Sequence, residues 1–90
     1  MPVLRREFTI HNKLGLHARA AAKIVQTTNQ FQSHIRMLKD GREVDAKSIL
    51  AILTLSCPQG TRIEVCAEGD DAVEAMEVLS VLFQNKFDEE

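Results

Sequence analysis

Hydrophobic and polar positions alternate along four segments of the chain, and this period of two predicts β-strands. We expect strands over residues 4–10, 32–38, 43–45 and 61–68. The last is the clearest, because Ile63, Val65 and Ala67 alternate with polar or charged neighbours. Asp40-Gly41 separates the second strand from the third, and this dipeptide favours a tight turn. These two strands are therefore expected to form a hairpin.

Apolar residues recur at the spacing of an amphipathic helix in three other segments. We expect helices over residues 18–28, 48–55 and 72–84. The buried face of the first helix is predicted to contain Ala21, Ile24, Val25 and Thr28. Ser48 is suited to cap the second helix, because its hydroxyl can accept a hydrogen bond from a backbone N–H that has no partner within the helix.

The third helix is preceded by Asp71, which forms the spacing of a capping box with Glu74. The residues that we expect this helix to bury are Val73, Met76, Leu79, Leu82 and Phe83. The element order is then βαββαβα. Each helix must bury an apolar stripe, whereas an antiparallel sheet can leave one face in water. We therefore predict an α+β fold, an open-faced β-sandwich with a four-stranded antiparallel sheet and three helices on one face.

The length of 90 residues predicts one compact domain, over residues 1–90, with a single thin core. Such a core leaves no room for a deep cleft, so we expect a site on the surface. The formal net charge is −2, and a field of this sign attracts neither nucleic acid nor an anionic membrane. The chain contains no tryptophan or tyrosine, so we expect no platform on which bases could stack.

Two cysteines, Cys57 and Cys66, lie nine residues apart. This is not the spacing of a metal site, and we expect neither a metal nor a cofactor. Small secreted domains contain more disulfides, so both residues are interpreted as reduced thiols of a cytoplasmic protein, with Cys66 on the open face of the sheet. We expect neither a signal peptide nor a membrane span, because no segment has the required apolar length.

His17 stands directly before the first expected helix, with Gly15 two residues before it and Arg19 two residues after it. The first turn of a helix has backbone N–H groups without intrahelical partners and carries the positive end of the helix dipole. An anion can bind at this position, and Arg19 offers a planar set of donors to the same group. The positive field also favours the neutral imidazole, which is the nucleophilic form. An imidazole here could therefore carry a phosphoryl group.

Three blocks of sequence resemble the HPr family, the histidine phosphocarriers of the phosphoenolpyruvate-dependent phosphotransferase system. Residues 12–19, NKLGLHAR, resemble the phosphorylation-site motif of the family. Residues 46–50, AKSIL, resemble its regulatory-serine segment, and residues 59–61 and 67–69 resemble its last strand and turn. The resemblance covers nearly the whole chain and keeps the element order derived above.

The resemblance implies that His17 accepts a phosphoryl group on Nδ1 from enzyme I and passes it to an enzyme IIA-type protein. It also implies a phosphate site formed by the Arg19 side chain and the backbone N–H groups of Ala18, Arg19 and Ala20. The family usually has proline at the position of Ala20, and alanine is compatible with the first turn of a helix. The phosphate site is therefore expected to be retained. We also expect the carrier to act as a monomer.

The second expected helix has more apolar residues than one buried stripe requires, and we interpret the excess as an exposed docking patch. The resemblance places Ile52 and Leu55 in the core. The partner-docking residues that it implies are Leu16, Ala20, Lys23, Ile49, Leu50 and Leu53. Ser48 has two interpretations, because it is either an N-cap alone or also the target of a regulatory serine kinase and phosphorylase.

Two other classes of function remain open at this point. A ligand-sensing α+β regulatory module, of the kind that binds amino acids, would need no reactive histidine. A ferredoxin-like metal chaperone would need a Cys-x-x-Cys loop, which the chain lacks. Within the HPr family, residues 12–15 and the ending, residues 81–90, resemble the nitrogen-related branch that is often called NPr. Phosphorylation by enzyme I would separate a phosphocarrier from a sensor.

Overall fold

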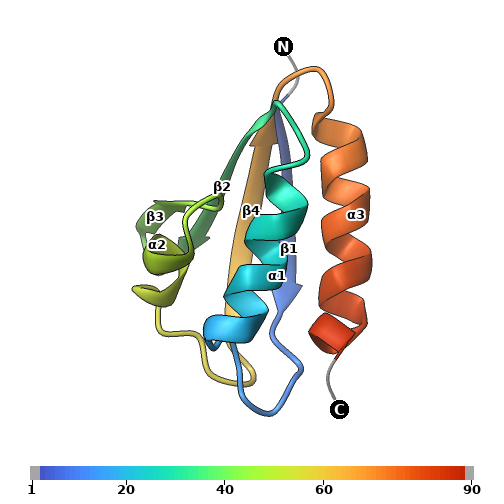
Figure 1. The fold of residues 1–90 in the computed structure, drawn as a ribbon. Helices are drawn as coiled ribbons and strands as arrows, with labels where there is room; N and C mark the ends of the chain where they lie inside the picture. The colour runs from blue at the N-terminus through green and yellow to red at the C-terminus, as the bar shows by residue number, and fades with distance from the viewer. Residues whose placement is uncertain (1–2, 89–90) are drawn as a thin grey trace.

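The computed structural model describes residues 3–88 and contains four strands and three α-helices in the predicted order (Figure 1). The strands are β1 (Val3–Thr9), β2 (His34–Lys39), β3 (Arg42–Asp45) and β4 (Arg62–Glu68). The helices are α1 (Ala18–Thr28), α2 (Ile49–Leu53) and α3 (Ala72–Gln84), and a short 3-10 turn, Lys86–Asp88, follows α3. The predicted bounds of α1 and α3 are confirmed, whereas α2 is shorter than predicted. The outermost residues of the expected domain, 1–2 and 89–90, lie outside the described part.

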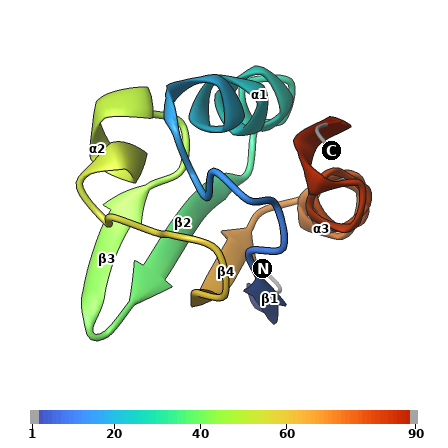
Figure 2. The same cartoon turned by 90° about the horizontal axis from the view of Figure 1, so that it is seen from below.

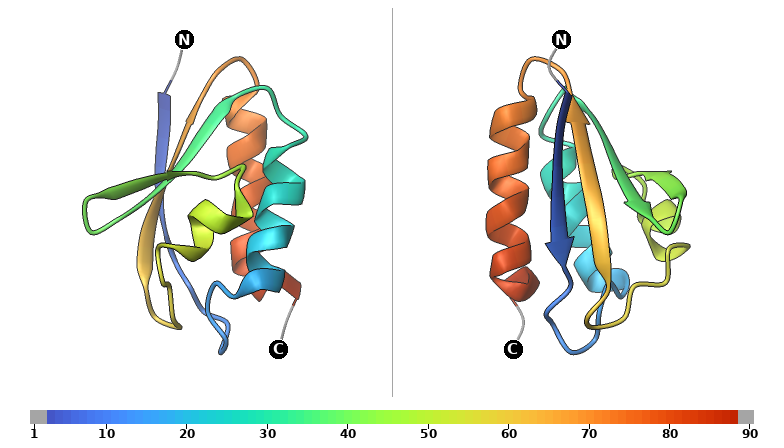
Figure 3. Two further views of the ribbon diagram at one scale, coloured as in Figure 1. Left: turned by 60° about the vertical axis from the view of Figure 1, so that its left-hand side comes forward. Right: turned by 180° about the vertical axis from the view of Figure 1, so that it is seen from behind.

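The four strands form one antiparallel sheet in the order β1-β4-β2-β3. Strand β4 lies inside the sheet, and its Ala67 is in register with Leu4 of β1 and Ile35 of β2. All three helices lie on one side of this sheet (Figure 2). The other side is left open by the described elements, as the view from behind shows (Figure 3). The predicted open-faced sandwich is confirmed.

The core lies between the sheet and the helices. Ile63, Val65 and Ala67 of β4 are each at most 2% exposed, as their alternation predicts. Phe8 of β1 stacks on Phe83 of α3 with ring centroids 4.5 Å apart, and this contact fixes α3 over the edge strand. The edge strand β1 is therefore held by packing against α3 as well as by its hydrogen bonds to β4.

The two long helices bury faces that differ slightly from the predicted ones. In α1, Val25 is only half-buried, whereas Ala20 is completely buried. In α3, the prediction for Val73 is wrong, because this side chain is 56% exposed while Ala72 and Ala75 are buried. The buried face of α3 therefore includes these two alanines in place of Val73. The other predicted residues, Ala21, Ile24, Thr28, Met76, Leu79 and Phe83, are buried, and Leu82 is half-buried.

The capping box predicted for α3 does not form. Asp71 is the N-cap residue, but its side chain makes no hydrogen bond to the helix. Its carboxylate instead accepts hydrogen bonds from the backbone N–H groups of Gln32, at 2.8 Å, and Ser33, at 2.9 Å, and from the Ser33 hydroxyl. The segment that leads into β2 thus presents three donors to Asp71 together, and these replace the amides of its own helix. These bonds hold the pKa of Asp71 below its usual value, with the Ser33 hydroxyl as the largest cause.

The β2–β3 hairpin turns at Asp40 and Gly41, whose φ angles are 50° and 82°. Both values are positive, as the tight turn predicted from the Asp-Gly dipeptide requires. The turn is closed by the facing pair Lys39 and Arg42. The predicted hairpin is therefore confirmed, and it presents two cations side by side.

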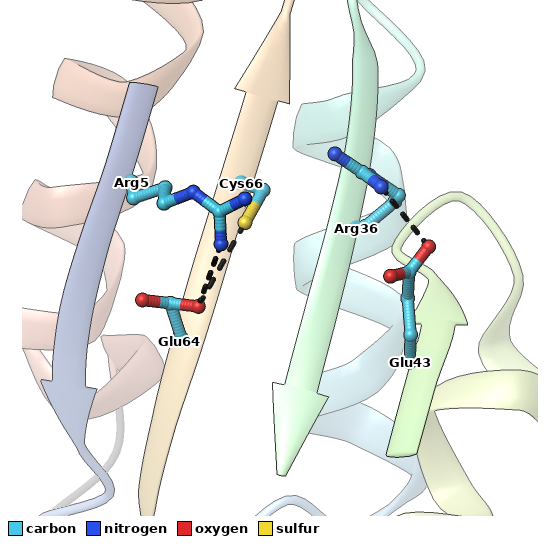
Figure 4. A network of polar contacts seen from close by, with 5 residues as sticks. All are labelled: Arg5, Arg36, Glu43, Glu64 and Cys66. Atoms are coloured by element: carbon cyan, nitrogen blue, oxygen red, sulfur yellow. Dashed lines mark hydrogen bonds and ion pairs between the residues drawn. The ribbon is translucent and has the colours of Figure 1, made fainter. Parts of the chain in front are cut away.

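The open face of the sheet carries a row of paired charges (Figure 4). Arg5 pairs with Glu64 at 3.4 Å, and Arg36 pairs with Glu43 at 3.1 Å. Cys66 points to the same face, between these pairs, and is in register with both arginines. The expected face is confirmed, but the thiol is not open to solvent, since Cys66 is 1% exposed. Its burial raises the pKa of the Cys66 thiol.

Candidate functional site

His17 is the N-cap residue of α1 and is half-exposed. Its backbone is extended, with φ −81° and ψ 179°, which is the usual conformation of an N-cap. The ring atom Nδ1 accepts a hydrogen bond from the backbone N–H of Arg19 at 3.2 Å. An accepting Nδ1 carries the lone pair of the imidazole, so the ring is in the tautomer that places the proton on Nε2. Nδ1 is therefore directed at the first turn of α1.

The first turn of α1 supplies the amides that the sequence predicted for an anion. The first intrahelical bond runs from the N–H of Ala21 to the carbonyl of His17, at 2.9 Å. The amides of Ala18, Arg19 and Ala20 precede this bond and have no acceptor within the helix. Ala18 and Arg19 are exposed, but Ala20 is completely buried, so its amide is set back from the surface. Of the three residues predicted to supply amides, Ala18 and Arg19 therefore lie at the surface and Ala20 lies beneath it.

The loop before His17 is held from two sides. Gly15 has a φ angle of +69°, and a Cβ atom there would collide with the carbonyl of Cys57 and lie 2.8 Å from Cα of Pro58. Leu16 donates its backbone N–H to the same Cys57 carbonyl at 2.8 Å. Asn12 is completely buried, and its Nδ2 donates to the Gly15 carbonyl at 2.7 Å. The position of His17 thus depends on a close backbone approach that only glycine permits.

The apolar surface of α2 divides as the sequence predicted. Ile52 and Leu55 are 0% and 2% exposed and belong to the core. Leu50 is 77% exposed and Ile49 is 37% exposed, while Leu53 is half-buried. The short helix therefore presents two large apolar side chains to solvent.

The predicted rim of this patch needs correction. Leu16 is only 6% exposed and Ala20 is completely buried, because both side chains pack into the core and do not point outward. Lys23 is half-buried, and its Nζ donates to the Phe87 carbonyl at 2.6 Å and lies 3.8 Å from the carboxylate of Asp88. Lys23 therefore binds the turn after α3, and no local pattern in α1 indicates this contact 64 residues away.

Sequence reasoning did not assign roles to two residues near the site. Leu14, in the loop before His17, is 73% exposed, which is unusual for a large apolar side chain. Asn12 lies within the motif of residues 12–19, and its buried hydrogen bond to the Gly15 carbonyl holds the loop. An asparagine three residues before a glycine is a common loop composition, so the sequence offered only a weak signal.

Ser48 is confirmed as the N-cap of α2. Its hydroxyl oxygen accepts a hydrogen bond from the backbone N–H of Ala51 at 3.2 Å. The residue is half-buried at the start of the helix. The cap accounts for a hydroxyl residue at this position whether or not the residue is modified.

Cys57 is 5% exposed, and this burial raises the pKa of its thiol. Within residues 3–88 there is no group of three or more His, Cys, Asp and Glu side chains arranged to hold a metal ion. None of the helices in this part of the chain has the length and apolar character needed to cross a membrane.

Comparison with known proteins places this site in a family. Residues 4–85 match the family model described as the phosphotransferase system HPr component phosphorylation site. The phosphocarrier protein HPr of Xylella fastidiosa (strain Temecula1) is 51% identical over 88 residues, covering 98% of this chain and 99% of the relative. The HPr of Cupriavidus necator is 45% identical over 87 residues, covering 97% of this chain and 98% of the relative.

Solved structures agree with this assignment. The crystal structure of HPr-C-His from Thermoanaerobacter tengcongensis superposes with a TM-score of 0.93 at 46% identity, covering 97% of this chain and 98% of that one. The crystal structure of the phosphocarrier protein HPr from Bacillus anthracis gives a TM-score of 0.86 at 38% identity, covering 92% and 99%. The chain therefore belongs to the HPr family of phosphocarrier proteins of the phosphotransferase system.

Proposed function

We propose that His17 is the residue on which this phosphocarrier holds its phosphoryl group, received from enzyme I and passed to an enzyme IIA-type protein. In the forward step, the Nδ1 lone pair attacks phosphorus and forms a P–N bond. The bond from phosphorus to enzyme I breaks, and its electron pair leaves with enzyme I. Phosphoryl transfer of this kind depends mainly on positioning and charge stabilisation, because its transition state is loose and in line.

The hydrogen bond from the Arg19 amide to Nδ1 is the observation that carries this proposal. It supports the proposal because Nδ1, the atom proposed to attack, accepts this bond at the positive end of α1. When Nδ1 is bonded to phosphorus it can no longer accept this hydrogen bond, so the Arg19 N–H becomes available to a phosphoryl oxygen. The neighbouring Ala18 amide and the exposed Arg19 guanidinium complete a set of donors for the dianion. The proton on Nε2 remains in place throughout.

The experiment is incubation with enzyme I and phosphoenolpyruvate, followed by mass spectrometry. We expect an acid-labile, alkali-stable gain of one phosphoryl group, which is absent in His17→Ala. The matched controls are His11→Ala and His34→Ala, because both of these histidines are exposed and lie outside the α1 terminus. A phosphoryl gain that persists in His17→Ala, or that disappears in a control, would contradict the assignment.

The exposed residues of α2, Ile49 and Leu50, together with half-buried Leu53, form the docking surface for enzyme I and enzyme IIA in this proposal. Its support is their exposure in a helix whose other large apolar residues are in the core. The chain acts as a monomer in the cytoplasm, where these partners act. Ser48 is a further target for a serine kinase and phosphorylase, since a phosphate at a helix N-terminus is electrostatically favourable.

The finer assignment is to the nitrogen-related branch, NPr. Its support is the sequence of residues 12–15 and of the ending, residues 81–90. The test presents the phosphorylated chain to an IIA protein of the nitrogen type and to one of the sugar type. Faster transfer to the nitrogen-type acceptor is expected, and faster transfer to the sugar-type acceptor would contradict the branch while leaving the role of His17 intact.

A further inference from the structure

Three consecutive backbone carbonyls at the end of α2 accept hydrogen bonds from the two cations of the β2–β3 hairpin. Arg42 donates from Nη1 to the Thr54 carbonyl at 2.7 Å. Lys39 donates from Nζ to the Leu55 carbonyl at 2.9 Å and to the Ser56 carbonyl at 2.6 Å. Because Lys39 and Arg42 face each other across the hairpin, both cations reach the same short segment.

The chemistry of this contact explains why two cations meet there. The carbonyls of Thr54, Leu55 and Ser56 follow the last residue of α2, Leu53, so they lie outside the hydrogen bonds of the helix itself and need other donors. Ser56 has a φ angle of 55°, so the chain leaves α2 in the left-handed region that an ordinary residue rarely adopts. Hydrogen bonds from charged donors are stronger than those between neutral groups. Lys39 and Arg42 therefore fix the path of the chain from Thr54 to Ser56.

The next residues of this segment support the loop that carries His17. The Cys57 carbonyl accepts the N–H of Leu16 at 2.8 Å. Gln59 donates from Nε2 to the His11 carbonyl at 2.9 Å, and the N–H of Gly60 donates to the Ile10 carbonyl at 2.7 Å. The two loops accordingly lie side by side at one end of the molecule (Figures 1 and 2).

We propose that Lys39 and Arg42 are positioning residues for phosphoryl transfer, which they support through residues 54–57. The path runs from Arg42 at the Thr54 carbonyl and Lys39 at the Ser56 carbonyl to the next residue, Cys57. The Cys57 carbonyl accepts the N–H of Leu16, which directly precedes His17. Neither cation touches the phosphoryl group. This inference rests on the proposed role of His17 and adds that the hairpin sets the geometry of its ring. A misplacement of about 1 Å at a reacting atom can slow a reaction about a hundredfold.

The test uses the double variant Lys39→Met/Arg42→Met, which keeps the aliphatic stems and removes both donors. Lys39 is half-buried and Arg42 is exposed, so the fold should survive. The matched control is Arg36→Met, which removes a cation from the same sheet whose Nη1 bonds Glu43 on the opposite face. A second pair, Lys39→Arg and Arg42→Lys, restores a charged donor at each position.

Two quantities are measured in each variant. One is the hydrogen exchange of the Leu16 amide relative to amides in the middle of β4, which report global unfolding. The other is the single-turnover rate of phosphoryl transfer from saturating phosphorylated enzyme I. In the double variant we expect Leu16 exchange to be about tenfold faster and transfer about tenfold slower. The control and the charge-retaining variants should stay close to the parent chain.

Each other outcome overturns the inference in a recognisable way. Unchanged exchange of Leu16 would show that the hairpin does not hold the loop. Faster exchange with an unchanged transfer rate would show that this support does not matter for the reaction. A loss of transfer shared by Arg36→Met would reflect surface charge alone. If the parent chain itself takes no phosphoryl group on His17, the proposed function fails first, and the inference fails with it.

Discussion

The starts of α1 and α3 are built alike and behave differently. Each has an N-cap residue with an ionisable side chain, and each has a glycine two residues earlier, Gly15 before His17 and Gly69 before Asp71. Both glycines have positive φ angles, and a Cβ atom at either would collide with a distant residue, with the Cys57 carbonyl at Gly15 and with Ser33, its hydroxyl oxygen first, at Gly69. At α1 the cap side chain bonds an amide of its own helix, two residues away. At α3 the side chain turns away from its helix to residues 38 and 39 positions distant.

Under the proposed function, this difference separates the reactive start of α1 from the structural start of α3. The Asp71 carboxylate is occupied by three donors that belong to the fold, so a ligand could bind only by displacing them. The Nδ1 atom of His17 accepts a hydrogen bond from the Arg19 amide of its own helix, and in the proposed reaction this amide can then donate to the incoming group. A helix start can bind an anion when the backbone amide that donates to the N-cap side chain can donate to the anion instead.

The largest expected effect comes from exchanging the cap chemistry at α1. In His17→Asp we expect alkali-stable phosphorylation to be abolished, because the carboxylate has no imidazole nitrogen. The free energy of unfolding should be unchanged or rise by up to about 1 kcal/mol, since aspartate is a favoured N-cap residue. Phosphorylation assays and urea unfolding measure the two quantities. A large loss of stability would show that the ring is a structural element, as Asp71 is.

The second largest effect comes from the two glycines. Gly15→Ala and Gly69→Ala should each lower the free energy of unfolding by about 1–3 kcal/mol, because both place a Cβ in an occupied, positive-φ position. Only Gly15→Ala should also slow phosphoryl transfer, since its collision lies at the Cys57 carbonyl that holds Leu16. Urea unfolding and transfer rates are compared in both variants. Equal loss of transfer in both would remove the distinction between the two helix starts.

A third test concerns the surface beside α1. Leu50→Asp should fold normally, because Leu50 is 77% exposed, and should weaken transfer from enzyme I about tenfold through its KM. The matched control is Ile52→Asp, which should unfold the domain because Ile52 is completely buried. Circular dichroism and steady-state kinetics measure both. Loss of folding in Leu50→Asp, or an unchanged KM, would exclude Leu50 from the docking surface.

The residues that sequence reasoning placed correctly share one property, which is that their causes are local. The caps at His17 and Ser48, the Asp40-Gly41 turn and the alternation in β4 all depend on neighbours within a few positions. Asp71 was misassigned because the capping-box spacing is also local, while the stronger donors come from the segment before β2. Long-range contacts leave no periodic trace in a single sequence.

The same reasoning explains the site residues that were placed incorrectly or overlooked. Leu16 and Ala20 were assigned to a surface rim, yet an apolar residue beside a helix start can equally face the core, as both do. Lys23, predicted for the same rim, also binds the 3-10 turn after α3, a contact that the sequence does not indicate. The sequence offers no signal for the roles of Lys39 and Arg42, because their carbonyl partners become neighbours only after the chain has folded.

The smallest expected effect on function, and the sharpest contrast with His17, belongs to Asp71→Asn. Because folding lowers the pKa of Asp71, the ionised carboxylate stabilises the native state at pH values above about 4. This contribution is lost as the pH falls through the lowered pKa, when the carboxylate of the folded protein takes up a proton. The variant has no such titration.

The difference in unfolding free energy between parent and variant should therefore be largest near neutral pH and should shrink in acid, while phosphoryl transfer at neutral pH stays unchanged. Urea unfolding between pH 7 and pH 3 measures this difference, with the exposed neighbour Asp70→Asn as the control. A difference that is constant with pH would mean that the bonds to Gln32 and Ser33 do not depend on the charge of Asp71.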